Sequence, residues 1–201
     1  MTKPLCIVIG VGPGNGASFA RRFSSDAHHV AILARNANYL NSLAESIPQC
    51  HAFPCDVQKP EALRQTLAEI AERLGSASVM IYNAGEGEWR PPEETTLEGF
   101  ESSWRTNALG LLVSAQAICQ DMSTQGRGNI VVIGATASIL GGATSTAFAS
   151  AKAAQRSLAQ SLARRFSPKG IHVSHIIIDG IIDLPRTREK RPDAPDDFYL
   201  Q

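Results

Sequence analysis

Short apolar runs alternate with longer segments of helical periodicity along this chain. Each run is rich in β-branched residues and too short for an ordinary helix, so each predicts a fully buried strand. The runs lie at residues 5–9, 30–33, 79–82, 130–133 and 171–178, with a weaker one at 51–53. The helical segments lie at residues 17–24, 37–47, 60–74, 100–122 and 147–166. This alternation predicts an α/β fold with a doubly wound parallel sheet, in a single domain over residues 1–201.

Composition limits the classes of partner. The 201 residues are 43% hydrophobic and 19% charged, which suits one folded domain with a core. Lys plus Arg and Asp plus Glu each number 19, so the net charge of zero disfavours nucleic acid or anionic lipid as a partner. No apolar run reaches the roughly 18 residues of a membrane span, and the first run breaks at once into glycines. We therefore expect no membrane partner and a cytoplasmic location.

Four cysteines are spread along the chain without the close pairing of metal ligands: Cys6, Cys50, Cys55 and Cys119. They are few for this length, so they predict buried thiols in a reducing compartment and no disulfide framework. We expect no metal site.

A glycine-rich turn, GVGPGNGA at residues 10–17, follows the first predicted strand and leads into a helix. Glycines let the backbone approach a pyrophosphate, and the helix N-terminus offers free N–H groups and a positive dipole end. The turn therefore predicts a dinucleotide in a Rossmann-like fold. Two registers fit: glycines at 10, 14 and 16, or the fingerprint Gly12-x-Gly14-x-x-Ala17. A structural turn without a ligand is the alternative.

The end of the second predicted strand bears on the choice of nucleotide. An acidic residue there would hold the ribose 2′-hydroxyl of NAD, but the sequence has Arg35 and no carboxylate. A guanidinium suits a 2′-phosphate, so the sequence favours NADP as cofactor, with NAD less favoured. Alternatively, Arg35 begins a solvated helix face.

Together these residues resemble the short-chain dehydrogenase/reductase family over almost the whole chain. The family's glycine motif, G-x-x-x-G-x-G, matches Gly10, Gly14 and Gly16. The family's acidic residue that contacts adenine matches Asp56, which is followed by Val57. Its Asn-Ala-Gly motif matches Asn83, Ala84 and Gly85. Its active-site Asn and Lys match Asn107 and Lys152.

The resemblance implies an oxidoreductase that uses a nicotinamide nucleotide and a small-molecule substrate. It places Gly10, Asn15 and Gly16 at the pyrophosphate, and Asp56 and Val57 at the adenine. It places the ribose and nicotinamide against Asn83, Ala84, Gly85, Lys152 and the backbone of Ile182. Asn107 and Lys152 are the catalytic positions that it supports.

Each of these positions also has a purely structural interpretation. Asp56 suits a turn or cap, and residues 83–85 suit a turn that ends a strand. Asn107 suits a buried polar residue that braces its helix. Lys152 suits the surface of an amphipathic helix.

The sequence departs from the family at two positions of its catalytic centre. Where the family has a Tyr four residues before the Lys, this chain has Phe148, which has no proton to transfer. Where the family has a Ser thirteen residues before that Tyr, this chain has Ala135. Thr136 would need a bulge to replace that Ser, and Ser138 has the correct parity but lies further along the chain.

The last part of the chain departs as well. Leu184 stands where the family has a Thr whose hydroxyl faces the cofactor. Residues 185–197 hold prolines and charges of both signs, so we expect a mobile loop around 184–197, either a substrate lid or a solvated tail. The chain stops at Gln201, before the family's last strand. The resemblance therefore gives no support to an interface through that edge, while a homo-oligomer through the long helices stays open.

Three functions remain open. The first is an NADP-dependent oxidoreductase acting on a carbonyl, an alcohol or an activated double bond, with weakened or altered catalysis. The second is a catalytically inactive nucleotide-binding protein that serves as a sensor or assembly partner. The third is a structural scaffold without a nucleotide. We expect the substrate to be lined by loops at residues 86–92, 140–146 and 184–197. Four glutamates make the first of these loops acidic, which argues mildly against an anionic substrate: Glu86, Glu88, Glu93 and Glu94. A solvated loop explains these glutamates equally well.

Overall fold

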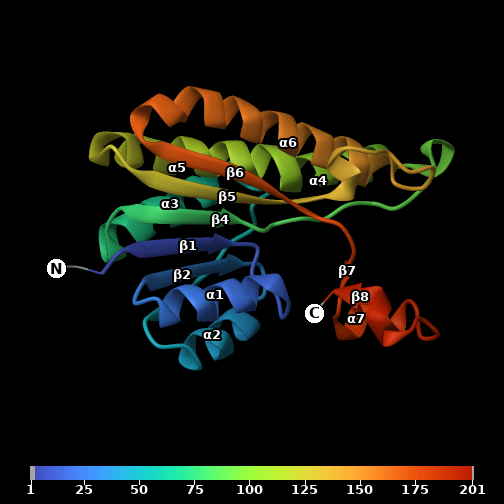
Figure 1. The fold of residues 1–201 in the computed structure, drawn as a ribbon, viewed down its shortest axis with the longest axis horizontal. Coiled ribbons are helices and arrows are strands. Elements are labelled where there is room, and N and C mark those ends of the chain that lie inside the picture. The colour runs from blue at the N-terminus through green and yellow to red at the C-terminus, as the bar shows by residue number, and fades with distance from the viewer. Residues whose placement is uncertain (1–2, 201) are drawn as a thin grey trace.

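The computed structural model describes residues 3–200, so the expectation about the end at Gln201 lies outside the described residues. A parallel sheet of six strands crosses the centre of the molecule (Figure 1). The strands are β1 (Leu5–Ile9), β2 (His29–Ala34), β3 (Cys50–Pro54), β4 (Ala77–Tyr82), β5 (Gly128–Ala135) and β6 (Ile171–Ile178). Their order is β3-β2-β1-β4-β5-β6. Every predicted strand is present, including the weak one, and the predicted doubly wound α/β fold is confirmed.

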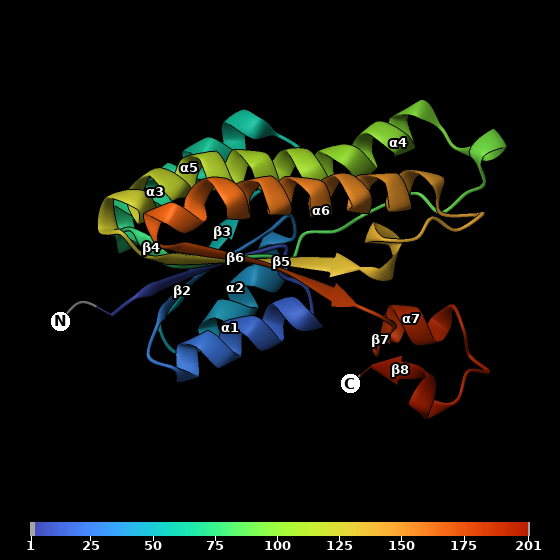
Figure 2. The same cartoon turned by 45° about the horizontal axis from the view of Figure 1, so that its top comes forward.

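Helices cover both faces of the sheet (Figure 2). One face carries α1 (Asn15–Ser25) and α2 (Ala37–Glu45). The other carries α3 (Pro60–Leu74), α5 (Gly110–Gln125) and α6 (Thr146–Phe166), and α4 (Leu97–Trp104) leads into α5. Short 3-10 turns lie at Pro92–Glu94, Thr136–Ser138, Ser167–Lys169 and Asp196–Phe198. Among residues 3–200, no helix is both long enough and apolar enough to cross a membrane.

Local sequence signals account for several helix ends. The side chain of Asn36 caps α2 by accepting from the Tyr39 N–H at 3.0 Å, and Thr96 caps α4 by accepting from Gly99. Pro60 occupies the first turn of α3, where its missing N–H is harmless. Gly126 ends α5 in a left-handed conformation.

The predicted helix over residues 100–122 is interrupted by a wider, π-helical segment at Arg105–Leu109. The hydroxyl of Tyr82 in β4 donates to the Thr106 carbonyl at 2.5 Å. The Gly110 N–H instead bonds the carbonyl of Arg105, five residues back. A side chain inserted into the helical ladder thus produces the π turn. The sequence pattern did not indicate it, because its cause lies on another strand.

The core has two layers, one on each face of the sheet, because the buried strands are apolar on both faces. Ile7 and Ile9 of β1 face the layer under α3 and α5. Cys6 and Val8 of the same strand face the layer under α1 and α2. Alternation along one strand therefore packs both helix layers.

A small C-terminal unit lies beside the carboxyl edge of the sheet (Figures 1 and 2). It comprises β7 (Ile181–Ile182), α7 (Pro185–Glu189) and β8 (Tyr199–Leu200), with β7 and β8 paired in parallel. Arg188 ties the unit together through Asp183 and Asp196, each at 2.6 Å. The segment expected as a mobile loop around residues 184–197 thus includes the short helix α7 and a 3-10 turn, and its mobility stays a prediction.

Candidate functional site

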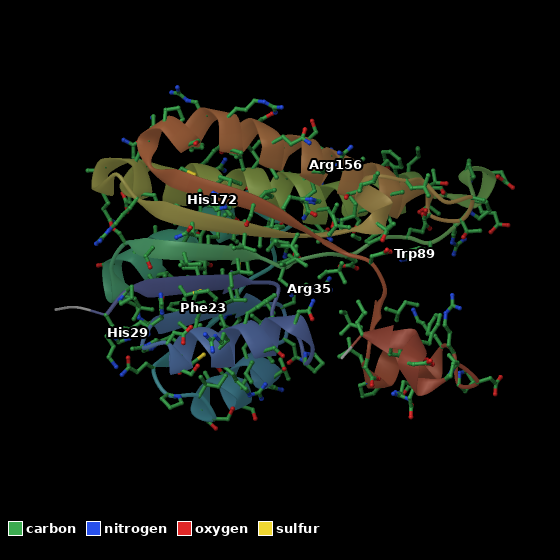
Figure 3. The ribbon with its side chains drawn as sticks, viewed as in Figure 1. Phe23, His29, Arg35, Trp89, Arg156 and His172 are labelled. Atoms are coloured by element: carbon green, nitrogen blue, oxygen red, sulfur yellow. The ribbon has the colours of Figure 1, made fainter. Side chains whose placement is uncertain are left out.

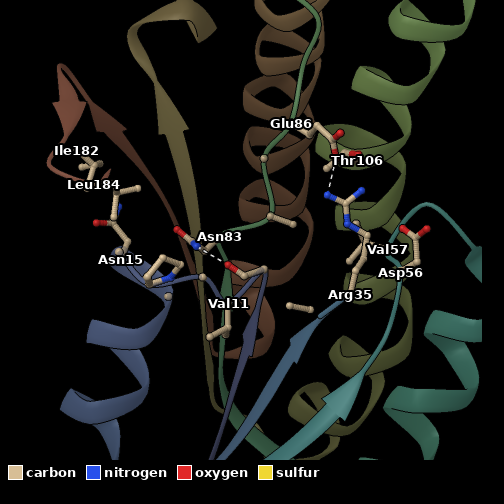
Figure 4. A pocket seen from close by; sticks show the side chains of 18 of the residues that line it. Val11, Asn15, Arg35, Asp56, Val57, Asn83, Glu86, Thr106, Ile182 and Leu184 are labelled. Carbon is tan, nitrogen blue, oxygen red and sulfur yellow. Dashed lines mark hydrogen bonds and ion pairs between the residues drawn. The ribbon is translucent and has the colours of Figure 1, made fainter. Parts of the chain in front are cut away.

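A cleft of about 450 Å³ opens at the carboxyl ends of β1, β2, β3 and β4 (Figure 4). The chain leaves β1 toward β2 and β3, and returns to β4 on the other side. This reversal is the usual ligand position in doubly wound sheets. The predicted cofactor residues that line the cleft are Gly10, Gly14, Asn15, Gly16, Arg35, Asp56, Val57, Asn83, Ala84, Gly85 and Ile182.

The glycine turn forms the floor of the cleft, and its contacts distinguish the two registers. Gly10 has a φ of +89°, and a Cβ there would collide with the backbone of Ala84. A Cβ on Gly16 would lie 2.6 Å from the Val11 Cα. At Gly12, no described heavy atom lies within 4 Å of the Cβ position. The packing thus requires glycine at 10 and 16, which favours the register 10, 14 and 16.

Helix α1 begins directly behind this turn, with Asn15 and Gly16 lining the cleft. The Ala17 and Ser18 N–H groups bond the carbonyls of Gly12 and Gly14. The first turn contains no acidic side chain. The positive end of the helix dipole is therefore available to an anion in the cleft.

Asn83 joins the end of β4 to the glycine turn. Its Nδ2 donates to the Gly10 carbonyl at 2.6 Å, and its backbone N–H donates to the Ile9 carbonyl at 2.8 Å (Figure 4). The Asn83 side chain therefore has a structural role. It holds the backbone of Ala84 and Gly85 at the wall of the cleft.

Arg35 reaches across the mouth of the cleft to Glu86, with 3.1 Å between the guanidinium and the carboxylate. Both side chains are well exposed. The sequence placed Glu86 among the residues of a substrate loop, whereas the structure places it in the same cleft as Arg35. Any anion that Arg35 binds must therefore compete with this carboxylate.

Asp56 and Val57 follow β3 at the side of the cleft. The Asp56 Oδ1 accepts from the Gln58 N–H at 3.0 Å, which is the turn role foreseen as its alternative. Gln58 itself lines the cleft and donates to the hydroxyls of Ser102 and Thr106, each at 2.9 Å. Sequence reasoning missed Gln58, because its partners lie more than forty residues away.

Asn107 lies in the π-helical segment and is fully buried. Its Nδ2 donates to the carbonyls of Glu86 and Ser103, at 2.7 and 2.8 Å. Its Oδ1 has no hydrogen-bond partner among residues 3–200. Through Ser103 the side chain braces its own helix, as the structural alternative proposed. Through Glu86 it also holds the loop after β4, and its Oδ1 is a buried acceptor.

Lys152 is 5% exposed, so the alternative of a surface lysine is wrong. Its Nζ donates to the Ile133 carbonyl and to the Gln155 Oε1, each at 3.0 Å. Burial lowers the pKa of Lys152 to about 8, because the charged form loses hydration. A Cβ on Gly85 would lie 3.3 Å from this Nζ and 3.6 Å from the Asn107 Oδ1. Lys152 and Asn107 therefore converge behind Gly85.

Phe148 lies one helical turn before Lys152, and its ring centroid is 5.9 Å from the Lys152 Nζ. Trp89 stacks on it, with ring centroids 4.6 Å apart and planes at 29°. Trp89 is 61% exposed, in the loop beyond β4 (Figure 3). The Phe148 side of the site is therefore an aromatic surface without a hydroxyl.

Ala135 ends β5, and the pairing with β6 keeps a regular register up to this residue. The Thr136 hydroxyl donates to Asp179 at 2.6 Å. Ser138 is buried, and its Oγ has no partner among the described residues. The β5–β6 pairing therefore contains no bulge up to Ala135 that would turn Thr136 into the place of the expected Ser.

The C-terminal unit closes one end of the cleft with Ile182, Leu184 and Thr187. A Leu184 methyl lies 3.1 Å from the Cβ position of Gly14. The Thr187 Oγ1 lies 2.7 and 2.8 Å from the carbonyl oxygens of Ile182 and Leu184, either of which can accept from its single O–H. Thr187 thus brings a hydroxyl to the end of the cleft where the sequence expected only Leu184. The family motif pointed to position 184, whereas Thr187 lies three residues further along the chain.

Comparisons with known proteins agree with this geometry. The family model for short chain dehydrogenases matches residues 4–195. A 3-oxoacyl-[acyl-carrier-protein] reductase of Bos taurus is 27% identical over 186 residues, which cover 92% of this chain and 78% of the relative. The crystal structure of a short-chain dehydrogenase from Rhodopseudomonas palustris is 30% identical with a TM-score of 0.83, and the match covers 98% of this chain and 95% of that one. A xylitol dehydrogenase with bound NAD⁺ has a TM-score of 0.88 at 23% identity, over 94% of this chain and 75% of that one, which shows a common fold.

Proposed function

This chain belongs to the short chain dehydrogenase family, and from that membership we propose that it is an NADP-dependent oxidoreductase. The reaction would move a hydride to or from a small carbonyl, an alcohol or an activated double bond. The observation that carries the proposal is the cleft itself. It is lined by a glycine cradle, a helix N-terminus and Arg35. The buried Asn107 and Lys152 do not line it, but they lie behind Gly85, which does.

The cleft fits a nicotinamide dinucleotide. Gly10 and Gly16 leave space that a Cβ would fill, so the backbone can approach a pyrophosphate beside the amides of Asn15 and Gly16. Arg35 suits a 2′-phosphate, and Asp56 with Val57 suits the adenine. Asn83, Ala84 and Gly85, the backbone of Ile182 and Lys152 suit the ribose and nicotinamide. When bound, the cofactor would supply the hydride.

Proton transfer is the step for which this chain differs from its family. Phe148 has no proton to give. The hydroxyls of Tyr82 and Tyr199 already donate to the carbonyls of Thr106 and Arg191. Lys152 is the ionisable side chain that lies beside Asn107, and burial lowers its pKa to about 8, which is nearer to neutral pH than the ordinary value. We infer that Lys152, with Asn107 Oδ1 as a neighbouring acceptor, orients the group that delivers the proton.

The missing phenol has a consequence for substrate choice. A positioned acid or base contributes roughly 10²- to 10⁴-fold to a rate, so ordinary ketone reduction should be slow. A polarised double bond is less affected, because hydride attack there does not require immediate protonation of an alkoxide. Activated double bonds are therefore the substrates that this site should reduce best.

The second candidate is a nucleotide-binding protein without turnover. Two observations favour it. Phe148 and Trp89 place stacked rings where a proton donor would act. The Thr136 hydroxyl already has Asp179 as a partner. Such a protein would bind the same nucleotide and report its presence to an assembly partner.

Binding separates these candidates from a scaffold without a ligand. We would titrate the protein with NADPH and then NADH at fixed ionic strength, with Arg35→Gln as the test variant and the exposed Arg21→Gln as the matched control. The proposal expects tighter NADPH binding, and loss of that preference in Arg35→Gln alone. Failure of both nucleotides to bind would remove both candidates. Binding without NADPH oxidation across ketones, aldehydes and enones would favour the second.

A further inference from the structure

Helix α6 places a second polar side chain beside Lys152 on its inner face. Gln155 follows three residues later and is fully buried, at 0% exposure. Residues three apart on a helix are neighbours, so the two side chains meet. The distance between the Lys152 Nζ and the Gln155 Oε1 is 3.0 Å.

The hydrogen bonds of the Lys152 ammonium show how many of its N–H donors the protein uses. A lysine ammonium has three N–H donors and no acceptor. Two of them are used within the protein, by the Ile133 carbonyl and by Gln155, each at 3.0 Å. The third is left on the side of Gly85, where the Asn107 Oδ1 has no partner among the described residues.

The chemistry of the pair also fixes the orientation of the amide. Because the ammonium only donates, the oxygen of Gln155 must face it, and the Nε2 must face away. That Nε2 has no partner among residues 3–200. Gln155 is thus held in the core by its contact with Lys152, since a buried amide is otherwise unfavourable there.

The charged groups around Lys152 come from two other positions. His175 of β6 lies over Gly134, where a Cβ would collide with the imidazole ring. Burial lowers the pKa of His175, and the charges of Lys152 and Arg156 lower it further. Arg156, also on α6, donates to the Ser138 carbonyl at 2.9 Å (Figure 3). No carboxylate forms an ion pair with Lys152 among the described residues.

We propose that Gln155 is a positioning residue for Lys152. It holds the ammonium on the protein side, so that one N–H is left for the ligand in the cleft. It does so as a neutral acceptor, which leaves the charge of the site unchanged. The catalytic consequence rests on the proposed function, whereas the positioning itself does not.

Two substitutions should change Lys152 in opposite directions. Gln155→Leu removes an acceptor of the charged form, so the pKa of Lys152 should fall by about one unit. Gln155→Glu adds an anion beside the ammonium, so the pKa of Lys152 should rise by about one unit or more. Gln160→Leu, on an exposed position of the same helix, is the matched control and should leave it unchanged.

The measurement is an NMR titration of the full-length protein labelled at the lysine Cε carbons. Lys152 is buried, whereas the other lysines are exposed: Lys3, Lys59, Lys169 and Lys190. Its signal, assigned by its loss in Lys152→Met, should titrate near pH 8 in the unchanged protein. Opposite shifts in the two Gln155 variants support the proposal. If the titration midpoint of Lys152 is the same in both folded variants, or moves in the same direction in both, the proposal is overturned.

Binding and turnover keep this inference apart from the proposed function. If NADPH oxidation occurs, the alkaline limb of the kcat/KM profile should follow the NMR midpoint in each variant, which a merely structural role of Gln155 would not produce. If the NMR midpoints shift but NADPH does not bind, the proposed function fails and the positioning role stands. Thermal unfolding of each variant checks that it is folded.

Discussion

The carboxylate of Glu86 lies 3.1 Å from the guanidinium of Arg35, across the mouth of the cleft that the glycine turn forms. The two residues come from the ends of different elements, β2 and β4, which are not neighbours in the sheet. The pair therefore closes the cleft from opposite sides. The cation that we propose for the 2′-phosphate of NADP is therefore already paired with an anion.

Removing that anion should strengthen NADPH binding. Exposed ion pairs contribute roughly 0.2–1 kcal/mol, so Glu86→Gln should lower the Kd for NADPH by about 1.4-fold to fivefold, while NADH binding changes little. The effect should shrink at high salt, because both side chains are exposed. Fluorescence titration at two ionic strengths measures it, with the exposed Glu93→Gln as control. An equal gain for NADH would contradict the assignment of Arg35 to the 2′-phosphate.

Restoring the missing hydroxyls should raise ketone reduction. Phe148→Tyr with Ala135→Ser returns a phenol near the Lys152 ammonium and a hydroxyl at the end of β5, so kcat/KM for a ketone should rise about 10²- to 10⁴-fold. Tyr keeps the ring that stacks on Trp89. Initial rates of NADPH oxidation provide the measurement, with Phe100→Tyr on exposed α4 as control. If the double variant stays at the original rate, the loss lies outside residues 135 and 148.

The glycine turn should tolerate alanine at one position and not at another. Gly10→Ala meets a positive φ and the backbone of Ala84, so the free energy of unfolding should fall by about 2 kcal/mol or more. Gly12→Ala meets open space and should change it by less than about 1 kcal/mol. Urea unfolding followed by circular dichroism compares the two. Equal losses of stability in Gly10→Ala and Gly12→Ala would contradict the register of glycines at 10, 14 and 16.

Because of Lys152, the free energy of unfolding should increase as the pH rises through the alkaline range. Its folded pKa of about 8 lies below the ordinary value of 10.5, so between these values only the unfolded chain binds the proton. Raising the pH through this window therefore stabilises the folded protein, by about 2 kcal/mol between pH 7 and pH 10. Lys152→Met lacks this contribution, and subtracting its values removes the effects of the cysteines and tyrosines. Urea unfolding of both proteins at the two pH values tests this. If the free energies of unfolding of the two proteins differ by the same amount at both pH values, Lys152 is not a buried lysine with a lowered pKa.

Much of the fold was predictable because its signals are local. The β1 run appears at residues 5–9 as predicted, since a parallel strand buried on both faces is a continuous apolar run. The run at residues 171–178 also forms a strand, but its expected full burial is wrong, because β6 lies at the edge of the sheet and exposes Ile176 and Ile177. The glycine turn was predictable for a similar reason, because the positive φ at Gly10 and the close backbone approach at Gly16 require residues without a side chain. The π-helical segment around Asn107 was not, since it depends on the hydroxyl of Tyr82 from another strand.

The site divides in the same way. Motif spacing predicted the positions of Asn107 and Lys152, but it could not show that Lys152 is buried, nor that Gln155 holds it. Thr187 and Gln58 were missed because no fixed spacing links them to the motifs. Glu86 was seen in the sequence but placed with the substrate loop, because only the folded chain shows that Arg35 faces it.

The sequence by itself determined the α/β architecture, the glycine cradle and the absence of a hydroxyl at residues 135 and 148. These follow from residue type and from order along the chain. Only the tertiary structure decided which register of glycines is needed, which anion competes for Arg35, and how the ammonium of Lys152 is held. The reason is that hydrogen bonds and burial depend on which distant segments meet, and that is settled only when the helices pack on the sheet.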